Sequence, residues 1–251
     1  TGISEIDYFV GGSHITPKIE ESHYVEKIWR LPEISQCFTP PDFEVTIGKL
    51  PAIKNGYITF GCVNKLSKIS DETVTLWSRI LESIPNSKLL LKNKDFDHQK
   101  IIENTFSRFV KHNVNKSRLV LQGGSATRKE LLEVYNEIDI ALDPFPFQGN
   151  TCTCESVWMG VPVITLKGDR FIFHFGESIN ANLNMHDWIA KNHNEYISKA
   201  IKFSSNLDQL SKIRMNLRKR ALQSPVFDAP RFAEYFSGML WDIWKKFSVQ
   251  K

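Results

Sequence analysis

The chain has 251 residues, of which 41% are hydrophobic and 24% charged, values typical of a globular protein that can bury a sizeable core. Its 32 basic and 28 acidic side chains leave a formal charge of +4, and no basic run is interleaved with aromatic residues as in nucleic-acid-binding faces. The most basic run, KIRMNLRKR at 212–220, is predicted to be one solvated helix face. No apolar run is as long as a membrane span, so we expect neither a nucleic acid nor a membrane as partner.

The first 55 residues are predicted to be largely irregular. They begin with TGISEIDYFVGG, which has no initiator methionine or signal peptide and indicates the middle of a domain, so we expect a fragment of a longer protein. One helical piece is predicted at 24–31. The stretch TPPDFEVTIGKLPAIKNG at 39–56 is predicted to be a linker, because proline fixes φ and removes a donor and Asn-Gly marks a turn.

From Tyr57 onward, short β-prone runs alternate with segments of helical periodicity. Strands are predicted at 57–63, 88–92, 118–124, 139–145 and 161–166. Helices are predicted at 70–86, 96–113 and 127–138, and a fourth begins near 150. Ser70 or Asp71 caps the first, and Thr127 with Glu130 forms a capping box on the third. This alternation predicts an α/β fold with a Rossmann-like, doubly wound parallel sheet. After about Phe173, only helices are predicted.

Ligands of doubly wound sheets bind at the carboxyl ends of the strands. Four segments are predicted to lie there, after the first, third, fourth and fifth strands: NKLSK at 64–68, QGGSATR at 122–128, DPFPFQGNTCTCE at 143–155 and KGDRF at 167–171. The sequence contains neither GxGxxG nor GxxxxGK[ST], which excludes the dinucleotide and P-loop fingerprints.

The loop 148–152 leads directly into the fourth helix, whose first N–H groups and dipole favour an anion. Thr151 and Thr153 add hydroxyl donors, and Glu155 lies one turn later, where a carboxylate can accept from a ribose hydroxyl. The alternative is a plain helix start in which Thr151 caps its own helix.

The four cysteines are Cys37, Cys62, Cys152 and Cys154. Their spacing matches neither a zinc site nor a CxxC redox pair, so we expect no metal. A chain of this size does not need a disulfide scaffold, so we expect a reducing compartment. Cys152 and Cys154 point in different directions on a helix, so one can line the site while the other packs in the core.

Several stretches in fixed order resemble the catalytic region of SPINDLY-type and O-GlcNAc-transferase-type glycosyltransferases of family 41. They are YITFGCVNKLSKIS, LWSRILESIPNSKLLLK, DIALDPFPFQGNTCTCESVWMGVPVIT, LRKRALQSPVFDAPRFA and WKKF, and the similarity runs from about Ile6 to Phe247. The resemblance implies a GT-B fold, in which a nucleotide sugar binds between two Rossmann-like lobes. It divides the chain into a remnant of the N-terminal lobe with its linker (1–53), the donor-binding lobe (54–225) and an amphipathic C-terminal helix (226–251).

The resemblance also implies roles for individual residues. Lys68 matches the catalytic lysine that contacts the donor diphosphate, where a cation stabilises the charge of the leaving group. Asn64 and Lys65 match neighbouring positions of the donor loop.

Asn150, Thr151 and Cys152 match the loop that holds the diphosphate, with Cys152 in place of a family threonine, and Thr153 follows them. Glu155 matches the acid that binds the ribose.

Ala126 and Arg128 match residues near the base. Leu131 stands where family members commonly have a histidine that stacks on the base. The family histidines proposed to act on the acceptor lie upstream of Thr1, and nothing around His14 or His23 indicates a general base. His174 is predicted to lie at the pocket rim.

The resemblance therefore implies part of an inverting, metal-independent O-glycosyltransferase that needs no cofactor beyond its donor. The donor is UDP-GlcNAc, UDP-glucose or GDP-fucose, and similarity to the SPINDLY branch favours GDP-fucose. The acceptor is Ser or Thr of a protein, and an upstream TPR region and a cytoplasmic location, with the nucleus as an option in a eukaryote, are expected. This fragment alone is expected to be inactive. The alternative is a non-catalytic nucleotide-sugar-binding or scaffold module, in which Leu131 and Cys152 mark a decayed site.

Overall fold

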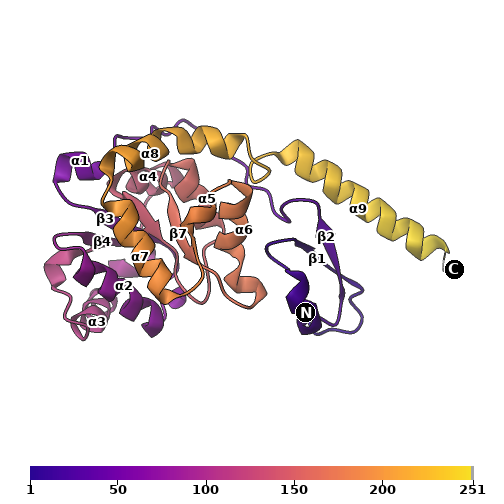
Figure 1. Ribbon diagram of the computed structural model, residues 1–251, viewed down its shortest axis with the longest axis horizontal. Coiled ribbons are helices and arrows are strands. Elements are labelled where there is room, and N and C mark those ends of the chain that lie inside the picture. Colours follow the sequence, from indigo (N-terminus) through magenta and orange to yellow (C-terminus); the bar gives the residue numbers. More distant parts are fainter. Residues whose placement is uncertain (250–251) are drawn as a thin grey trace.

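A six-stranded parallel sheet with the strand order β5-β4-β3-β6-β7-β8 forms the centre of the molecule (Figure 1). The structure is a computed structural model and describes residues 1–249. The strands are β3 (Thr59–Val63), β4 (Lys88–Lys92), β5 (Leu119–Gln122), β6 (Ile140–Leu142), β7 (Val163–Leu166) and β8 (Ile189–Ala190). The chain moves outward from β3 to β5 and then returns to β6 beside β3. The predicted doubly wound α/β fold is confirmed.

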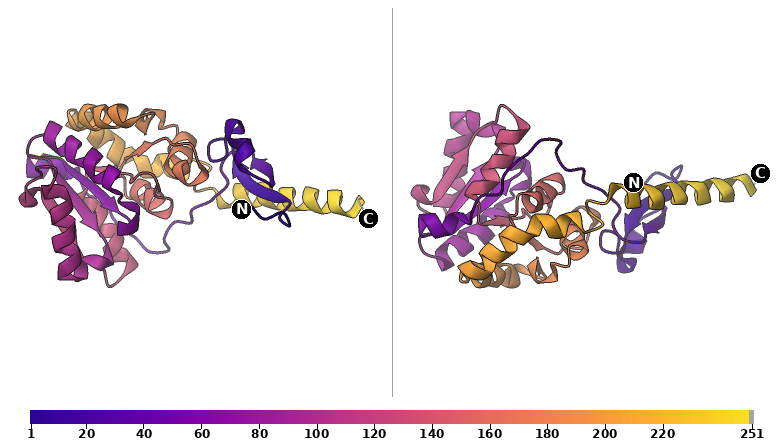
Figure 2. Two further views of the ribbon diagram at one scale, coloured as in Figure 1. Left: turned by 90° about the horizontal axis from the view of Figure 1, so that it is seen from below. Right: turned by 90° about the horizontal axis from the view of Figure 1, so that it is seen from above.

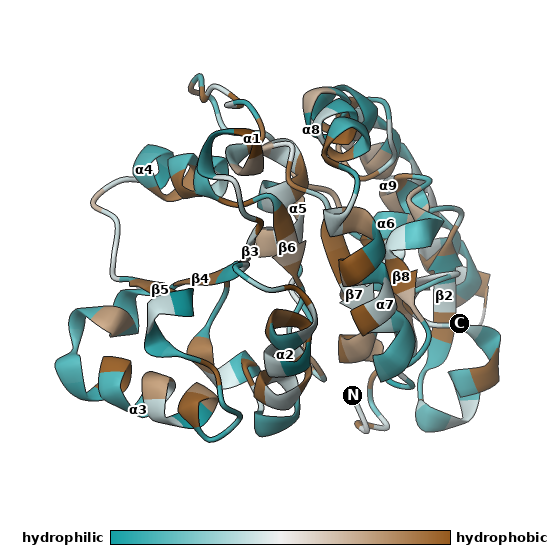
Figure 3. Ribbon diagram, turned by 60° about the vertical axis from the view of Figure 1, so that its left-hand side comes forward, coloured by the Kyte–Doolittle hydropathy of each residue, from teal (hydrophilic) through white to brown (hydrophobic). Residues whose placement is uncertain are grey.

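Helices cover both faces of this sheet. They are α2 (Asp71–Ser83), α3 (Gln99–Val110), α4 (Arg128–Glu133), α5 (Thr151–Trp158), α6 (Phe175–Asn182), α7 (His193–Ser204) and α8 (Leu207–Leu222). Figure 3 shows α2 and α3 on one side of the sheet and α4 and α5 on the other. In addition, α7 packs against α2, while α6 and α8 pack against α5. Right-handed crossovers require this arrangement, because the chain reverses its direction across the sheet after β5.

Local sequence explains most helix boundaries. Ser70 caps α2 by accepting a hydrogen bond from the amide of Thr73, and the apolar residues at helical spacing, Trp77 among them, are buried. Thr127 caps α4, but the Glu130 carboxylate accepts from the Ala126 amide, one residue earlier than in a regular capping box. The predicted helix 127–138 is shorter in the structure, because it tightens into a 3-10 turn over Val134–Glu137.

The N-terminal segment differs from the prediction. It contains two parallel strands, β1 (Tyr8–Gly12) and β2 (Lys27–Leu31), joined through the 3-10 helix η1 (Lys18–His23). The helix predicted at 24–31 is therefore wrong, because backbone pairing with β1 overrides the local helical spacing. The prediction that only helices follow Phe173 is also wrong, because β8 adds a sixth strand beside β7.

The N-terminal segment and the C-terminal helix lie beside each other outside the six-stranded sheet. The 21-residue helix α9 (Ala229–Val249) extends away from the sheet alongside β1 and β2 (Figures 1 and 2). Positions 250–251 of the predicted C-terminal helix lie outside the described residues. Among residues 1–249, no helix combines the length and apolarity that crossing a membrane requires.

Arg214 of α8 is a fully buried cation within the basic run at 212–220. Its guanidinium donates to the carbonyl oxygens of Gly48 (2.9 Å), Ile138 (2.8 Å) and Tyr135 (3.2 Å). The prediction that this run forms one solvated face is therefore wrong at Arg214. This residue joins the linker before the short helix α1 (Pro51–Asn55) to the main lobe, which is the six-stranded sheet with the helices that cover it.

A second arginine on α8 holds the same linker. Arg218 donates to the carbonyl oxygens of Val45 (2.9 Å) and Trp158 (2.7 Å). Nearby, the amide of Phe38 donates to the carbonyl oxygen of Val226 at 2.8 Å. The chain therefore enters and leaves the main lobe at neighbouring points.

We expect Arg214→Met to lower the free energy of unfolding by about 3 kcal/mol, because buried carbonyl groups lose their charged donor. Urea denaturation followed by tryptophan fluorescence measures this difference. The control Arg220→Met, an exposed position on the same helix, should change stability by no more than about 0.5 kcal/mol. Equal effects of the two variants would show that the contacts of Arg214 contribute no specific stability.

Candidate functional site

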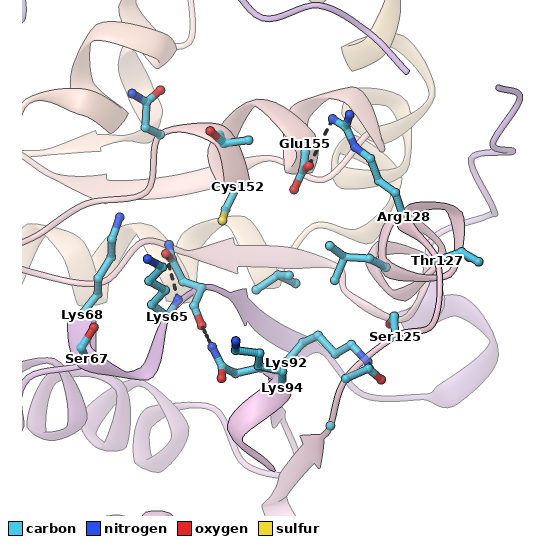
Figure 4. A pocket seen from close by; sticks show the side chains of 18 of the residues that line it. Lys65, Ser67, Lys68, Lys92, Lys94, Ser125, Thr127, Arg128, Cys152 and Glu155 are labelled. Atoms are coloured by element: carbon cyan, nitrogen blue, oxygen red, sulfur yellow. Dashed lines mark hydrogen bonds and ion pairs between the residues drawn. The ribbon is translucent and has the colours of Figure 1, made fainter. Parts of the chain in front are cut away.

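A cleft of about 830 Å³ opens at the carboxyl ends of β3, β4 and β5, opposite the start of α5. It lies beside the point where the strand order reverses, between β3 and β6, which is where doubly wound sheets bind ligands. Among the described residues, its lining contains five basic side chains and one carboxylate: Lys65, Lys68, Lys92, Lys94, Arg128 and Glu155. Figure 4 shows these side chains around the cleft. The excess of positive charge suits an anionic ligand.

The structure brings nearly all predicted site residues into this cleft. The lining includes Asn64, Lys65, Lys68, Ala126, Arg128, Leu131, Asn150, Thr151, Cys152 and Glu155. Thr153 does not line it, because its side chain is buried behind the loop, close to Gly149.

Sequence reasoning missed one wall of the cleft. Lys92, Asn93 and Lys94 line it from the end of β4, the strand whose carboxyl end was left out of the prediction. In contrast, the predicted segment 167–171 after β7 does not line it. The expected strand order could have indicated this wall. In a doubly wound sheet the second strand lies between the first and the third, so the residues after it lie between the two segments that were predicted.

The start of α5 has no side-chain cap. Asn150 occupies the cap position and its carbonyl oxygen accepts from the amides of Thr153 and Cys154, both at 3.1 Å. Among the described residues, no oxygen atom accepts a hydrogen bond from the amides of Thr151 and Cys152. The alternative in which Thr151 caps its own helix is therefore not what the structure shows. Thr151 and Cys152, at the positive end of the helix, both line the cleft.

Lys68 brings a positive charge toward the same place. It ends the short 3-10 turn η2 (Leu66–Lys68) that follows β3, and its Nζ donates to the carbonyl oxygen of Gln148 at 2.8 Å. The ammonium also lies 3.9 Å from the centre of the Phe147 ring. Partial burial lowers the pKa of Lys68. Since an ammonium has three donors, Lys68 can hold this loop and still bind an anion.

Hydrogen bonds between loops brace the wall formed by β4. Asn93 Nδ2 donates to the carbonyl oxygen of Asn64 at 2.9 Å, and Lys92 Nζ donates to that of Gly124 at 3.0 Å. The ends of β3, β4 and β5 are thus connected independently of any ligand.

Glu155 and Arg128 close the far side of the cleft. Arg128 Nη2 lies 3.4 Å from Glu155 Oε1, and Glu155 is largely buried. Burial raises the pKa of Glu155, while the nearby guanidinium opposes that change. The pair leaves carboxylate oxygen capacity for hydroxyl donors of a ligand.

Cys152 and Cys154 have different environments, as predicted. The Cys152 thiol points into the cleft between Lys68 and Glu155 (Figure 4), whereas Cys154 is buried in the core. Burial raises the pKa of Cys152 to about 11, so the thiol is neutral at physiological pH. All four cysteines are free, and within residues 1–249 no three His, Cys, Asp or Glu side chains gather as a metal site would require.

His174 was predicted to lie at the pocket rim, and this prediction is wrong. The residue is fully buried and does not line the cleft. Its ring lies between the carboxylates of Glu20 and Glu177. The burial reflects contact with the N-terminal segment, which local sequence does not reveal.

Asp143, directly after β6, holds the loop that precedes α5. Its Oδ1 accepts from the amide of Gly149 at 2.6 Å and its Oδ2 from the hydroxyl of Thr165 at 2.9 Å. Burial raises the pKa of Asp143 to about 7, although both hydrogen bonds favour the charged form.

Comparisons with known proteins agree with this geometry. The sequence profile described as Glycosyl transferase family 41 matches residues 38–236. The chain is 33% identical over 247 residues to the probable UDP-N-acetylglucosamine--peptide N-acetylglucosaminyltransferase SPINDLY of Arabidopsis thaliana, covering 98% of this chain and 27% of that protein. The chain thus spans about a quarter of the length of this curated relative.

Solved structures show the same similarity. A mutant of the Thermobaculum terrenum O-GlcNAc transferase superposes with a TM-score of 0.89 at 30% identity, covering 98% of this chain and 46% of that one. The Anabaena protein HepE, in complex with UDP and glucose, superposes with a TM-score of 0.62 at 12% identity, covering 94% of this chain and 63% of that one. The second likeness shows the fold alone.

We expect Asp143→Asn to change how stability depends on pH. A carboxyl whose pKa is raised in the folded state binds its proton more tightly there, so the wild type loses stability as pH rises from about 4 through about 7. Asparagine does not titrate. Relative to wild type, the variant should gain on the order of 2–4 kcal/mol between pH 4 and 8. Urea denaturation at several pH values tests this, and a constant difference between the proteins would contradict it.

Proposed function

The chain belongs to glycosyl transferase family 41, and on that premise we propose that it is the donor-binding part of a protein O-glycosyltransferase. Such an enzyme moves one sugar from a nucleotide sugar to Ser or Thr of a protein. The carrying observation is that Thr151 and Cys152, at the uncapped start of α5, line the same cleft as Lys68. The names of the relatives, a peptide N-acetylglucosaminyltransferase and an O-GlcNAc transferase, support this assignment.

In this proposal the diphosphate of the donor lies at the start of α5. The amides of Thr151 and Cys152 donate to its oxygens, and Lys68 contributes a charge-assisted hydrogen bond. The ribose lies toward Glu155, whose carboxylate accepts from its hydroxyls. The base then falls near Ala126 and Leu131, and Leu131 offers it an apolar surface.

The same groups assist the chemical step. The hydroxyl oxygen of the acceptor forms a bond to the anomeric carbon, while the bond from that carbon to the phosphate oxygen breaks and the nucleoside diphosphate leaves. The hydroxyl proton passes to the leaving diphosphate or to solvent. Negative charge grows on the leaving diphosphate, so donors already aimed at it stabilise the transition state. Protein cations thus offset the diphosphate charge without a metal ion.

The proposed donor is a UDP- or GDP-linked sugar, namely UDP-GlcNAc or GDP-fucose, and the proposed partner is a protein with an acceptor Ser or Thr. The proposal also includes an upstream TPR region and a cytoplasmic location. The free thiol state of all four cysteines supports a reducing compartment.

Lys68→Ala should weaken binding of UDP or GDP at least tenfold, about 1.4 kcal/mol, because the diphosphate loses a charged donor. Isothermal titration calorimetry measures the affinity. Lys219→Ala removes an equal charge from an exposed position on α8 and should leave affinity within about twofold. Failure of the wild-type chain to bind either nucleotide would refute the donor site.

Glu155→Gln should separate ribose recognition from phosphate recognition. The neutral amide loses charge-assisted hydrogen bonds to the ribose, so affinity for UDP or GDP should fall about tenfold. Affinity for inorganic pyrophosphate should stay within about twofold, and the exposed Glu133→Gln on α4 serves as control. An equal loss for pyrophosphate would mean that Glu155 does not bind the ribose.

A non-catalytic nucleotide-sugar-binding module is the second candidate, because Leu131 and Cys152 both line the cleft in place of a family histidine and threonine. Sugar transfer to a peptide by the complete protein that contains this chain, followed by mass spectrometry with several nucleotide sugars, decides between the two. Transfer with any donor rules out the module.

A further inference from the structure

Three ionisable side chains outside the cleft form a buried cluster that joins two parts of the molecule. Glu20 belongs to η1 in the N-terminal segment, whereas His174 and Glu177 lie at the start of α6 in the main lobe. His174 is fully buried and both glutamates are nearly so. Its Nδ1 lies 2.7 Å from Glu177 Oε2 and its Nε2 lies 2.8 Å from Glu20 Oε1. Burial of three such groups in one place is costly unless their charges are matched.

The geometry specifies the protonation of the ring. A neutral imidazole has one N–H and one lone pair, so it can donate to only one of two carboxylates. The other ring nitrogen would then face a carboxylate oxygen with its lone pair. Both short contacts are satisfied when the ring carries two protons and donates to Glu20 and Glu177 together. Among the described residues, Glu20 Oε2 has no partner of its own, so the ring supplies the hydrogen bond that this carboxylate has.

The charged neighbours of the ring are consistent with an imidazolium. Burial by itself lowers the pKa of His174, but the hydrogen bonds that the ring donates to Glu177 and Glu20 outweigh it and raise the pKa above its usual value. Lys167, after β7, donates to the second oxygen of Glu177 at 2.7 Å. Two further groups belong to this surrounding, His14 after β1 and His186 in the turn before β8, and burial lowers the pKa of His14.

The backbone of α6 and two hydrogen bonds of Gln148 connect this cluster to the cleft. His174 is the cap residue of α6, and the amide of Gly176 in the first turn donates to the side chain of Gln148 at 2.7 Å. The carbonyl oxygen of Gln148 in turn accepts from Lys68 Nζ. There is little slack in this contact, because a Cβ at Gly176 would lie 2.3 Å from Asp143 Oδ2. A shift of the first turn of α6 therefore moves the loop that holds Lys68.

We propose that Glu20, His174 and Glu177 form a proton-holding latch that fixes the N-terminal segment on the main lobe and positions Lys68 through α6 and Gln148. His174 is a positioning residue in this scheme and does not touch the ligand. The latch itself is independent of the function proposed above, and only its effect on nucleotide affinity rests on that function.

The sign of the pH dependence follows from the two shifts. The folded-state pKa of His174 is raised, so its contribution is complete below the usual value of 6.5 and is lost as pH rises through the raised pKa. Burial raises the pKa of Glu177, but bonds to His174 and Lys167 outweigh this and lower it, so its contribution is lost only in acid, below 4.5. The latch is therefore closed between these limits and opens in base.

Long-range proton–nitrogen NMR of the histidine rings in the 251-residue chain tests the protonation directly. At pH 7.5 both nitrogens of His174 should carry protons, because the ring donates to two carboxylates at once. A neutral His174 ring at that pH would overturn the latch.

Glu20→Gln keeps the shape and removes one charge, so the titration midpoint of His174 should fall by at least about one unit. Glu21→Gln, on the same 3-10 helix but exposed and paired with Arg30, should leave the midpoint unchanged. If Glu20→Gln proves unfolded by circular dichroism, Glu20→Asp retains the charge with a longer contact and should lower the midpoint by less than one unit. An unchanged midpoint in the folded Glu20 variant would overturn the proposal.

Nucleotide affinity measured by calorimetry between pH 7 and 9 tests the positioning of Lys68. The wild type should lose affinity as His174 loses its proton, and Glu20→Gln should show the same loss at lower pH. Identical pH profiles for the two proteins would overturn the positioning role. Absence of UDP or GDP binding at every pH would instead refute the proposed function, while the ring NMR still decides the latch.

Discussion

The reversal of strand order between β3 and β6 is the constraint from which the cleft follows. Because the crossovers on either side of this point run over opposite faces of the sheet, a crevice opens beside the carboxyl ends of these two strands. The loops after β3 and β6 are therefore free to carry polar groups. They meet where Lys68 donates to Gln148, and the uncapped start of α5 lies beside this contact. Asp143 accepts a hydrogen bond from the Gly149 amide and so fixes the loop before α5. The polar surface is therefore formed without a ligand.

Sequence periodicity predicted the main lobe well because its strands and helices are long enough to show their own pattern. It failed where pairing partners decide. Residues 24–31 have helical spacing, yet residues 27–31 pair with β1, and β8 has only two residues, too few for any pattern. The wall at Lys92 required the strand order, which no local window contains. His174 contacts Glu20 across 154 positions of sequence, so its burial could not be inferred from the residues around it.

Resemblance to a family and physical argument contributed different parts of the site. The resemblance pointed to residues that the structure places in one cleft, from Asn64 to Glu155. Packing shows why they stay there: Asn93 and Lys92 tie neighbouring loops together, and Tyr135 donates to the carbonyl oxygen of Cys152 at 3.1 Å in the first turn of α5. Cys152 could be expected from its residue type to be reactive. It is instead a neutral, partly buried thiol, because burial disfavours the thiolate.

The neighbouring entry and exit of the main lobe restrict how its outer part can turn. A part of a protein attached by one chain segment can rotate in every direction. A part attached by two adjacent segments rotates easily about a single axis. Here the two connecting segments are joined by the hydrogen bond from the Phe38 amide to the Val226 carbonyl oxygen. Arg214 and Arg218 hold the first of them by hydrogen bonds to the carbonyl oxygens of Gly48 and Val45. The N-terminal segment and α9 contact each other outside this pair of connections, so we expect them to rotate together. The contact of Glu20 with His174 restrains that rotation.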